Sequence, residues 1–147
     1  MNKPAQNSQS ISLLNKTSDS VRLSDFLTEY VKTFELSDET YNDLRLVAEE
    51  AFINIASYAY TEKDNQPVVI ELSNTSDEIN ITFSDTGIAF DPLTDPAECK
   101  ESDDHCEGGM GIQIITSLTD RQTYNRVGQS NVFTVTKHYT KQKNNEK

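Results

Sequence analysis

An apolar stripe along residues 44–59 constrains this chain more than any other sequence feature. Apolar side chains recur there at spacings of three and four through about four turns, which predicts a long amphipathic helix. Ser37, followed by two acidic residues, offers an N-cap for this helix. The stripe must be buried against another layer of the fold. Its members are Leu44, Val47, Ala48, Ala51, Phe52, Ile55, Ala56 and Ala59.

The other predicted elements are a further amphipathic helix and several short strands. Residues 18–34 carry apolar side chains at helical spacing, and residues 68–72 and 78–83 alternate like the strands of an antiparallel hairpin. A strand over 11–14, a helix over 111–118 and strands over 121–125 and 131–138 complete the set. Helices placed before and inside a mainly antiparallel sheet predict an α+β two-layer sandwich.

Length and polarity predict one domain with polar tails. The chain has 147 residues, and residues 11–138 contain all the predicted elements, so we expect them to form a single domain. Residues 1–10 and 141–147 carry almost no apolar side chains and are expected to be disordered.

Charge and composition narrow the cellular setting. The formal net charge is −11, which argues against a direct nucleic-acid partner or an anionic membrane surface. No run approaches the roughly 20 apolar residues of a membrane span, and the first residues lack a signal peptide's apolar stretch. Two cysteines, in one hydrophilic segment, are too few for a secreted disulfide framework. We therefore expect a cytoplasmic protein.

Polar residues border the apolar stripe of the long predicted helix. Glu50, Asn54 and Tyr58 are spaced four apart and form a row along one flank. A carboxylate and a carboxamide one turn apart can hold a metal ion or water beside a polar ligand. On the helix alone, solvated side chains explain the same row.

Two further motifs follow along the chain. In DTGIAFDP, residues 85–92, the period of two places Asp85 on the core-facing side of its strand, and Gly87 would let the backbone approach a flat ligand. In GGMG, residues 108–111, glycines open a helix, where free backbone N–H groups suit a phosphate. Four of the five glycines fall between Gly87 and Gly111, which favours function in this region.

The ordered set of motifs is more specific than its parts. Glu-x-x-x-Asn on a helix, Asp-x-Gly after a strand and Gly-x-Gly opening a helix resemble the N, G1 and G2 boxes of the GHKL (Bergerat-fold) ATPases. The segments LRLVAEEAFINIASYAY, FSDTGIAFDP and GGMGIQII are most similar to those of the bacterial anti-sigma factor serine/threonine kinases. The resemblance covers about residues 38–138.

The resemblance implies ATP and Mg²⁺ as cofactors and assigns a role to each motif residue. Asn54 would bind the Mg²⁺ that bridges the phosphates, and Asp85 would accept a hydrogen bond from the adenine amino group. Glu50 would be the general base for a partner's serine or threonine hydroxyl, and residues 93–107 would form the ATP lid. The remaining nucleotide contacts would come from Tyr58, Gly87, Phe90, Gly108, Gly109, Met110 and Gly111.

The same resemblance implies the partners. The family's usual substrate is a STAS-domain anti-sigma antagonist, and its second partner is a sigma factor. Relatives often form homodimers, and the helix of residues 18–34 could face either the sheet or a second subunit. A histidine kinase catalytic domain is disfavoured because only about 35 residues precede the N-box helix, too few for a phosphoacceptor hairpin.

Two alternatives stay open from the sequence. Tyr58 stands where family members commonly have a histidine, and residues 93–107 are strongly acidic, which would fit a nucleotide-gated binding module without catalysis. Cys99, His105 and Cys106 could begin a zinc site, although no Cys-x-x-Cys pair is present.

Overall fold

The described part of the chain contains a five-stranded antiparallel sheet. The computed structural model describes residues 7–59, 66–93 and 108–139. The strands lie in the order β1-β2-β3-β5-β4, and every neighbouring pair is antiparallel. Their bounds are β1 Asn7–Leu14, β2 Pro67–Asn74, β3 Glu78–Asp85, β4 Arg121–Val127 and β5 Ser130–His138.

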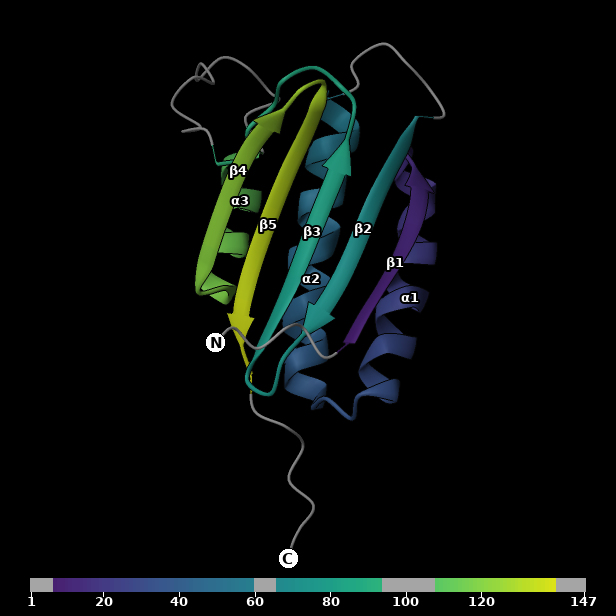
Figure 1. Cartoon of the computed structure of the whole chain (residues 1–147), viewed down its shortest axis with the longest axis vertical. Helices are drawn as coiled ribbons and strands as arrows, with labels where there is room; N and C mark the ends of the chain where they lie inside the picture. Colours follow the sequence, from purple (N-terminus) through teal and green to yellow (C-terminus); the bar gives the residue numbers. More distant parts are fainter. Residues whose placement is uncertain (1–6, 60–65, 94–107, 140–147) are drawn as a thin grey trace, which may run out of the picture.

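The helices form the second layer. A 3-10 turn (Thr17–Asp19) leads into α1 (Ser20–Thr33), which is followed by α2 (Asp38–Asn54), a π-helical turn (Ile55–Ala59) and later α3 (Gly108–Leu118). The α-helices α1, α2 and α3 lie on the same face of the sheet (Figure 1). The α+β two-layer sandwich predicted from the sequence is confirmed.

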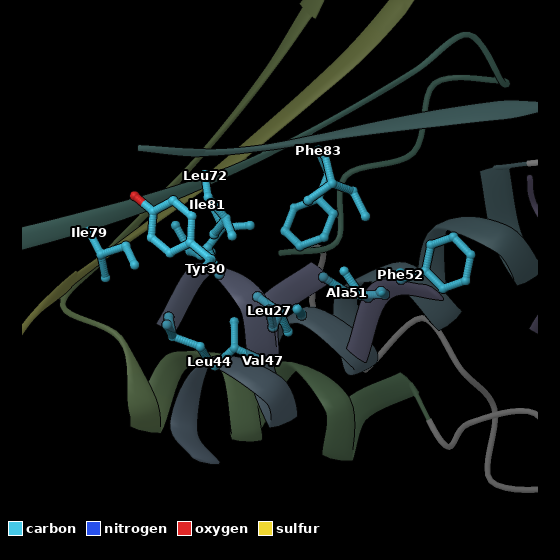
Figure 2. Packing of buried hydrophobic residues seen from close by; sticks show 14 of the residues in the cluster. Leu27, Tyr30, Leu44, Val47, Ala51, Phe52, Leu72, Ile79, Ile81 and Phe83 are labelled. Carbon is cyan, nitrogen blue, oxygen red and sulfur yellow. The ribbon is translucent and has the colours of Figure 1, made fainter. Parts of the chain in front are cut away.

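The core lies between α1, α2 and the covered face of the sheet. Alternate residues of β3 are buried, as the period of two predicts, and Figure 2 shows their side chains reaching toward α1 and α2. In the register of β3 with β5, Ile81 pairs with Val135 and Phe83 with Phe133. The next core-facing pair is Asp85 with Asn131, so two apolar rows end together in polar residues.

The apolar stripe is buried as predicted from Leu44 to Ala56, and the side chain of Ala59 lies outside the described residues. The Ser37 side chain accepts a hydrogen bond from the Thr40 backbone N–H at 3.1 Å, which confirms the N-cap.

The last turn of the predicted helix differs from a regular α-helix. The α-helix ends at Asn54, and residues 55–59 form a π turn rather than the continued α-helix that the stripe predicted. A π turn changes the direction in which the side chains near a helix end point. Such turns occur frequently at functional sites.

Two boundary segments differ from the sequence expectation. Residues 7–10, placed in the disordered tail, belong to β1, because backbone pairing with residues 71–74 of β2 orders them without apolar side chains. Asn74, expected in the hairpin turn, is buried and accepts a hydrogen bond from the Tyr30 hydroxyl. Burial raises the pKa of the Tyr30 hydroxyl, with a smaller contribution from Tyr139.

Just after α1, the backbone of Glu35 has a left-handed conformation that costs free energy. The Leu36 N–H bonds to the Val31 carbonyl at 3.0 Å, and the Glu35 N–H bonds to the Lys32 carbonyl at 3.3 Å. This is the Schellman arrangement, in which the residue after the helix takes a left-handed conformation. Glu35 has φ 58°, a value that favours glycine over a residue with a Cβ atom.

We therefore expect Glu35→Gly to raise the free energy of unfolding by about 1 kcal/mol, because it removes the Cβ strain of the left-handed conformation. The matched control is Glu29→Gly, at an exposed position inside α1, which should lower it by about 1 kcal/mol. Urea unfolding followed by circular dichroism measures both. Equal destabilisation by the two variants would contradict the expectation.

Candidate functional site

One end of the two-layer fold brings the sequence motifs together. The C-terminal ends of α2 and β3, the N-terminal end of α3 and the turn between β4 and β5 all lie at the upper end of the molecule in Figure 1. The helix α2 also packs against α3. The antiparallel topology thus brings residues that are far apart in the chain together at one end of the sheet.

Asp85 is the buried carboxylate of this end, with 4% of its surface exposed. Its Oδ1 atom accepts hydrogen bonds from the Gly87 backbone N–H at 2.9 Å and from the Asn131 side-chain amide at 2.8 Å. Its Oδ2 atom has no hydrogen-bond donor among the described residues. A buried acceptor without a donor costs about 1–3 kcal/mol, so a ligand N–H at this oxygen would be stabilising.

Asn131 is a residue of the candidate site that the sequence motifs did not indicate. It is 3% exposed and bonds Asp85, the Ile88 carbonyl at 2.8 Å and the Phe90 backbone N–H at 3.1 Å. Arg126 of β4 donates to the Asn131 side-chain oxygen at 3.1 Å and to the Gly87 carbonyl at 2.9 Å. An asparagine in a strand of β-branched and aromatic residues is the signal that could have found it.

Asn54 is a second buried polar group that has no partner within the part of the chain that the structure describes. It is the last residue of α2, is 6% exposed, and its side-chain amide has no hydrogen bond to any described residue. Most buried side-chain amides are hydrogen-bonded, so an unpaired amide beside a π turn calls for an explanation. The oxygen of this carboxamide could bind a cation, as the sequence analysis expects for Mg²⁺.

The two adjacent carboxylates of α2 differ in their surroundings. Glu49 lies 3.3 Å from the Arg45 guanidinium, one turn away on the helix. Glu50 is half-buried and has no ion-pair partner among the described residues. Since Glu50 precedes Asn54 by one turn, it lies on the flank of α2 that leads to the unpaired amide.

The glycine motif and Phe90 also lie at this end. Residues 108–111 form the first turn of α3, where backbone N–H groups lack helical partners and the helix dipole favours an anion. Gly87 is buried, and Phe90 is partly buried against the core. Tyr58 belongs to the π turn, but its side chain lies outside the description.

The acidic segment that the sequence identified as a lid lies mostly outside the described residues. Residues 94–107 are among those left undescribed, and they include Cys99, His105 and Cys106. Within the described residues, no cluster of three or more His, Cys, Asp or Glu side chains could hold a metal ion. None of the described helices is long and apolar enough to cross a membrane.

The chemistry of this end follows from its unpaired groups. Among the described residues, one oxygen of the Asp85 carboxylate has no donor, the Asn54 carboxamide has no hydrogen bond, and the half-buried Glu50 carboxylate has no ion-pair partner. The start of α3 provides free N–H groups suited to an anion. Such a set fits a ligand that combines an amino group with an anionic, metal-binding portion.

Comparison with known proteins identifies the family of the chain. The family described as "Histidine kinase-like ATPase domain" matches residues 14–137. The serine/threonine-protein kinase BtrW of Bordetella bronchiseptica is 31% identical over 97 residues, 65% of this chain and 68% of that protein.

Other relatives carry related names. The serine-protein kinase RsbW of Staphylococcus aureus is 34% identical over 100 residues, which cover 61% of this chain and 63% of that protein. The anti-sigma F factor of Clostridium perfringens is 27% identical over 96 residues, which cover 64% of this chain and 69% of that protein.

A solved structure supports the fold alone. The histidine kinase domain of a blue-light activated kinase from Erythrobacter litoralis superimposes with a TM-score of 0.51 at 15% identity, covering 82% of this chain and 59% of that one. The family match and the named relatives confirm the family resemblance inferred from the sequence. The chain therefore belongs to the histidine kinase-like ATPase (GHKL) family, in the group that includes the bacterial anti-sigma serine-protein kinases.

Proposed function

We propose that this protein is an ATP-binding serine/threonine protein kinase of about residues 11–138 that acts as an anti-sigma-like regulator. It transfers the γ-phosphate of ATP to a serine or threonine of a STAS-type antagonist. The observation that carries the proposal is the Oδ2 atom of Asp85. This atom is a buried acceptor at the end of β3 that has no donor among the described residues.

The base-binding part of the proposal rests on Asp85 and Gly87. Asp85 offers an acceptor to the 6-amino group of adenine, and Gly87 has no side chain to keep the base from the backbone. The first turn of α3 offers N–H groups to the phosphates, with Gly108, Gly109 and Gly111 allowing close approach and Met110 among them. Phe90 and Tyr58 belong to the same predicted contact set.

The phosphate part of the proposal rests on Asn54. Its carboxamide is buried and lacks a hydrogen-bond partner among the described residues, which suits an oxygen ligand of Mg²⁺. When bound, Mg²⁺ neutralises charge on the phosphates during transfer. Asn54 holds its position at the end of α2 because the neighbouring stripe residues Ala51 and Phe52 are packed in the core.

Glu50 supplies the proposed proton acceptor. Its half-buried carboxylate lies one turn before Asn54, and no ion pair within the described residues occupies it. In phosphoryl transfer such a group orients the attacking hydroxyl and takes its proton, while catalysis comes chiefly from positioning and charge neutralisation. The names of the relatives, serine-protein kinase and anti-sigma F factor, support a protein substrate and a sigma factor as partners.

The first test is nucleotide binding by Asn54→Ala. We expect Mg-ATP affinity to fall at least tenfold by isothermal titration, whereas stability is unchanged or slightly raised, because the amide makes no hydrogen bond within the described residues. Asn42→Ala, an exposed asparagine of the same helix, is the matched control and should leave affinity unchanged. Wild-type affinity in Asn54→Ala would overturn its assignment as the Mg²⁺ ligand.

The second test separates catalysis from binding. Glu50→Gln should lower phosphate transfer from labelled ATP to a STAS protein encoded by a neighbouring gene by about 10²–10⁴-fold, with Mg-ATP affinity retained. Glu49→Gln, which removes a charge already paired with Arg45, should transfer at nearly the wild-type rate. If wild type binds ATP but transfers no phosphate, the protein is a nucleotide-gated binding module instead.

A further inference from the structure

The solvent-facing side of α2 carries two large aliphatic side chains. Residues opposite the core-facing stripe of a surface helix are normally polar, and α2 follows this rule at Asn42 and Glu49. Leu46 and Ile53 do not follow it, because 42% and 37% of their surfaces are exposed. The helices α1 and α3 lie on either side of α2 (Figure 1), so the outer face of α2 is the one that stays accessible.

These two aliphatic residues lie on either side of Glu50, the proposed proton acceptor. Leu46 precedes Glu50 by four residues and Ile53 follows it by three, and these spacings place side chains next to one another on a helix surface. The helical rise separates Leu46 from Ile53 by about 10 Å along the axis. The half-buried Glu50 carboxylate is therefore bordered by an exposed aliphatic side chain toward each end of the helix.

We infer that Leu46 and Ile53 are the residues on which the phosphoacceptor protein docks. The inference rests on the proposed function, in which Glu50 takes the proton of the acceptor hydroxyl. That hydroxyl must come within about 3 Å of the Glu50 carboxylate, so the segment that carries it lies across the neighbouring surface of α2. Leu46 and Ile53 occupy this surface, and docking buries them.

The charges on this face indicate which acceptor fits it. The Glu49 carboxylate lies 3.3 Å from the Arg45 guanidinium, whereas Glu50 has no ion-pair partner among the described residues. Glu50 would repel an acidic side chain beside the acceptor hydroxyl. An aliphatic side chain at the same place would lose its contact with water by packing on Leu46 or Ile53. The face therefore fits a serine or threonine that is flanked by uncharged, apolar residues.

Position distinguishes this pair from other exposed aliphatic residues. Val21 of α1 is 64% exposed and Val69 of β2 is 40% exposed, and single exposed aliphatic residues are common on soluble proteins. Neither valine lies on the helix that carries Glu50. Leu46 and Ile53 are both one helical turn from this carboxylate, where a protein substrate has to make contact.

The test replaces each aliphatic side chain by a polar one. Leu46→Gln and Ile53→Gln change exposed positions and keep good helix formers, so folding by circular dichroism and Mg-ATP affinity by isothermal titration should be unchanged. Transfer of labelled phosphate is measured against the concentration of the STAS protein encoded by a neighbouring gene. We expect each variant to raise the KM for this protein about tenfold, while kcat changes less than about twofold.

Val21→Gln is the matched control, because it makes the same kind of change at an exposed aliphatic residue of α1. It should leave both the KM for the STAS protein and kcat at their wild-type values. An equal rise of KM in Val21→Gln and in the two α2 variants would overturn the docking role. If one α2 variant fails to fold, the other provides the same comparison.

The remaining outcomes separate this inference from the proposed function. If the wild type binds Mg-ATP but transfers no phosphate to the STAS protein, the proposed kinase function is wrong, and the docking role is wrong with it. If the wild type transfers phosphate and both α2 variants keep its KM, only the docking role is wrong. If light scattering shows that Leu46→Gln or Ile53→Gln dissociates a wild-type dimer, a second copy of the chain covers this face, and the docking role is again wrong.

Discussion

The hydrogen bond between Asn131 and Asp85 joins the neighbouring strands β5 and β3 where their apolar rows end. On the core side of this pair, Phe83 and Phe133 lie opposite one another with ring centroids 6.1 Å apart. Beyond the pair, the chain leaves β3 and turns through Gly87 and Ile88, whose backbone groups are held by Asp85, Asn131 and Arg126. The shape of the loop at the candidate site therefore depends on a contact between the neighbouring strands β3 and β5.

Buried polar groups without partners at the candidate site lower the free energy of unfolding, and the apolar core must offset this loss. Asn54 and the outer oxygen of Asp85 are buried without partners among the described residues, at a cost of about 1–3 kcal/mol each. The core residues that α1, α2 and the covered sheet face contribute, such as Leu27, Phe52 and Phe83, are fully buried. Polar groups kept unpaired at a cost are typical of binding sites, where stability is exchanged for function.

The sequence predicted the parts of the fold that depend on local periodicity. Helical spacing located the α2 stripe, and the period of two placed Asp85 inward at the end of β3. The Asn131 network was not predictable in this way, because it depends on the register of β3, β5 and β4 rather than on any one segment. The π turn and the ordering of residues 7–10 likewise depend on neighbouring elements.

The polar groups at the two ends of the sheet differ in their pairing, because those away from the candidate site have partners. At the end away from the site, Lys137 lies 3.1 Å from Asp43 of α2 and donates to the Leu118 carbonyl at 3.0 Å, so one ammonium ties both helices to β5. Nearby, Asn74 bonds the hydroxyls of both Tyr30 and Tyr139. These closed networks hold the start of α2 and the end of α3. Asn54 lies at the opposite end of α2, and the glycine motif of residues 108–111 lies at the opposite end of α3. Both helices are therefore fixed by contacts that lie at a distance from the ligand that they are proposed to bind.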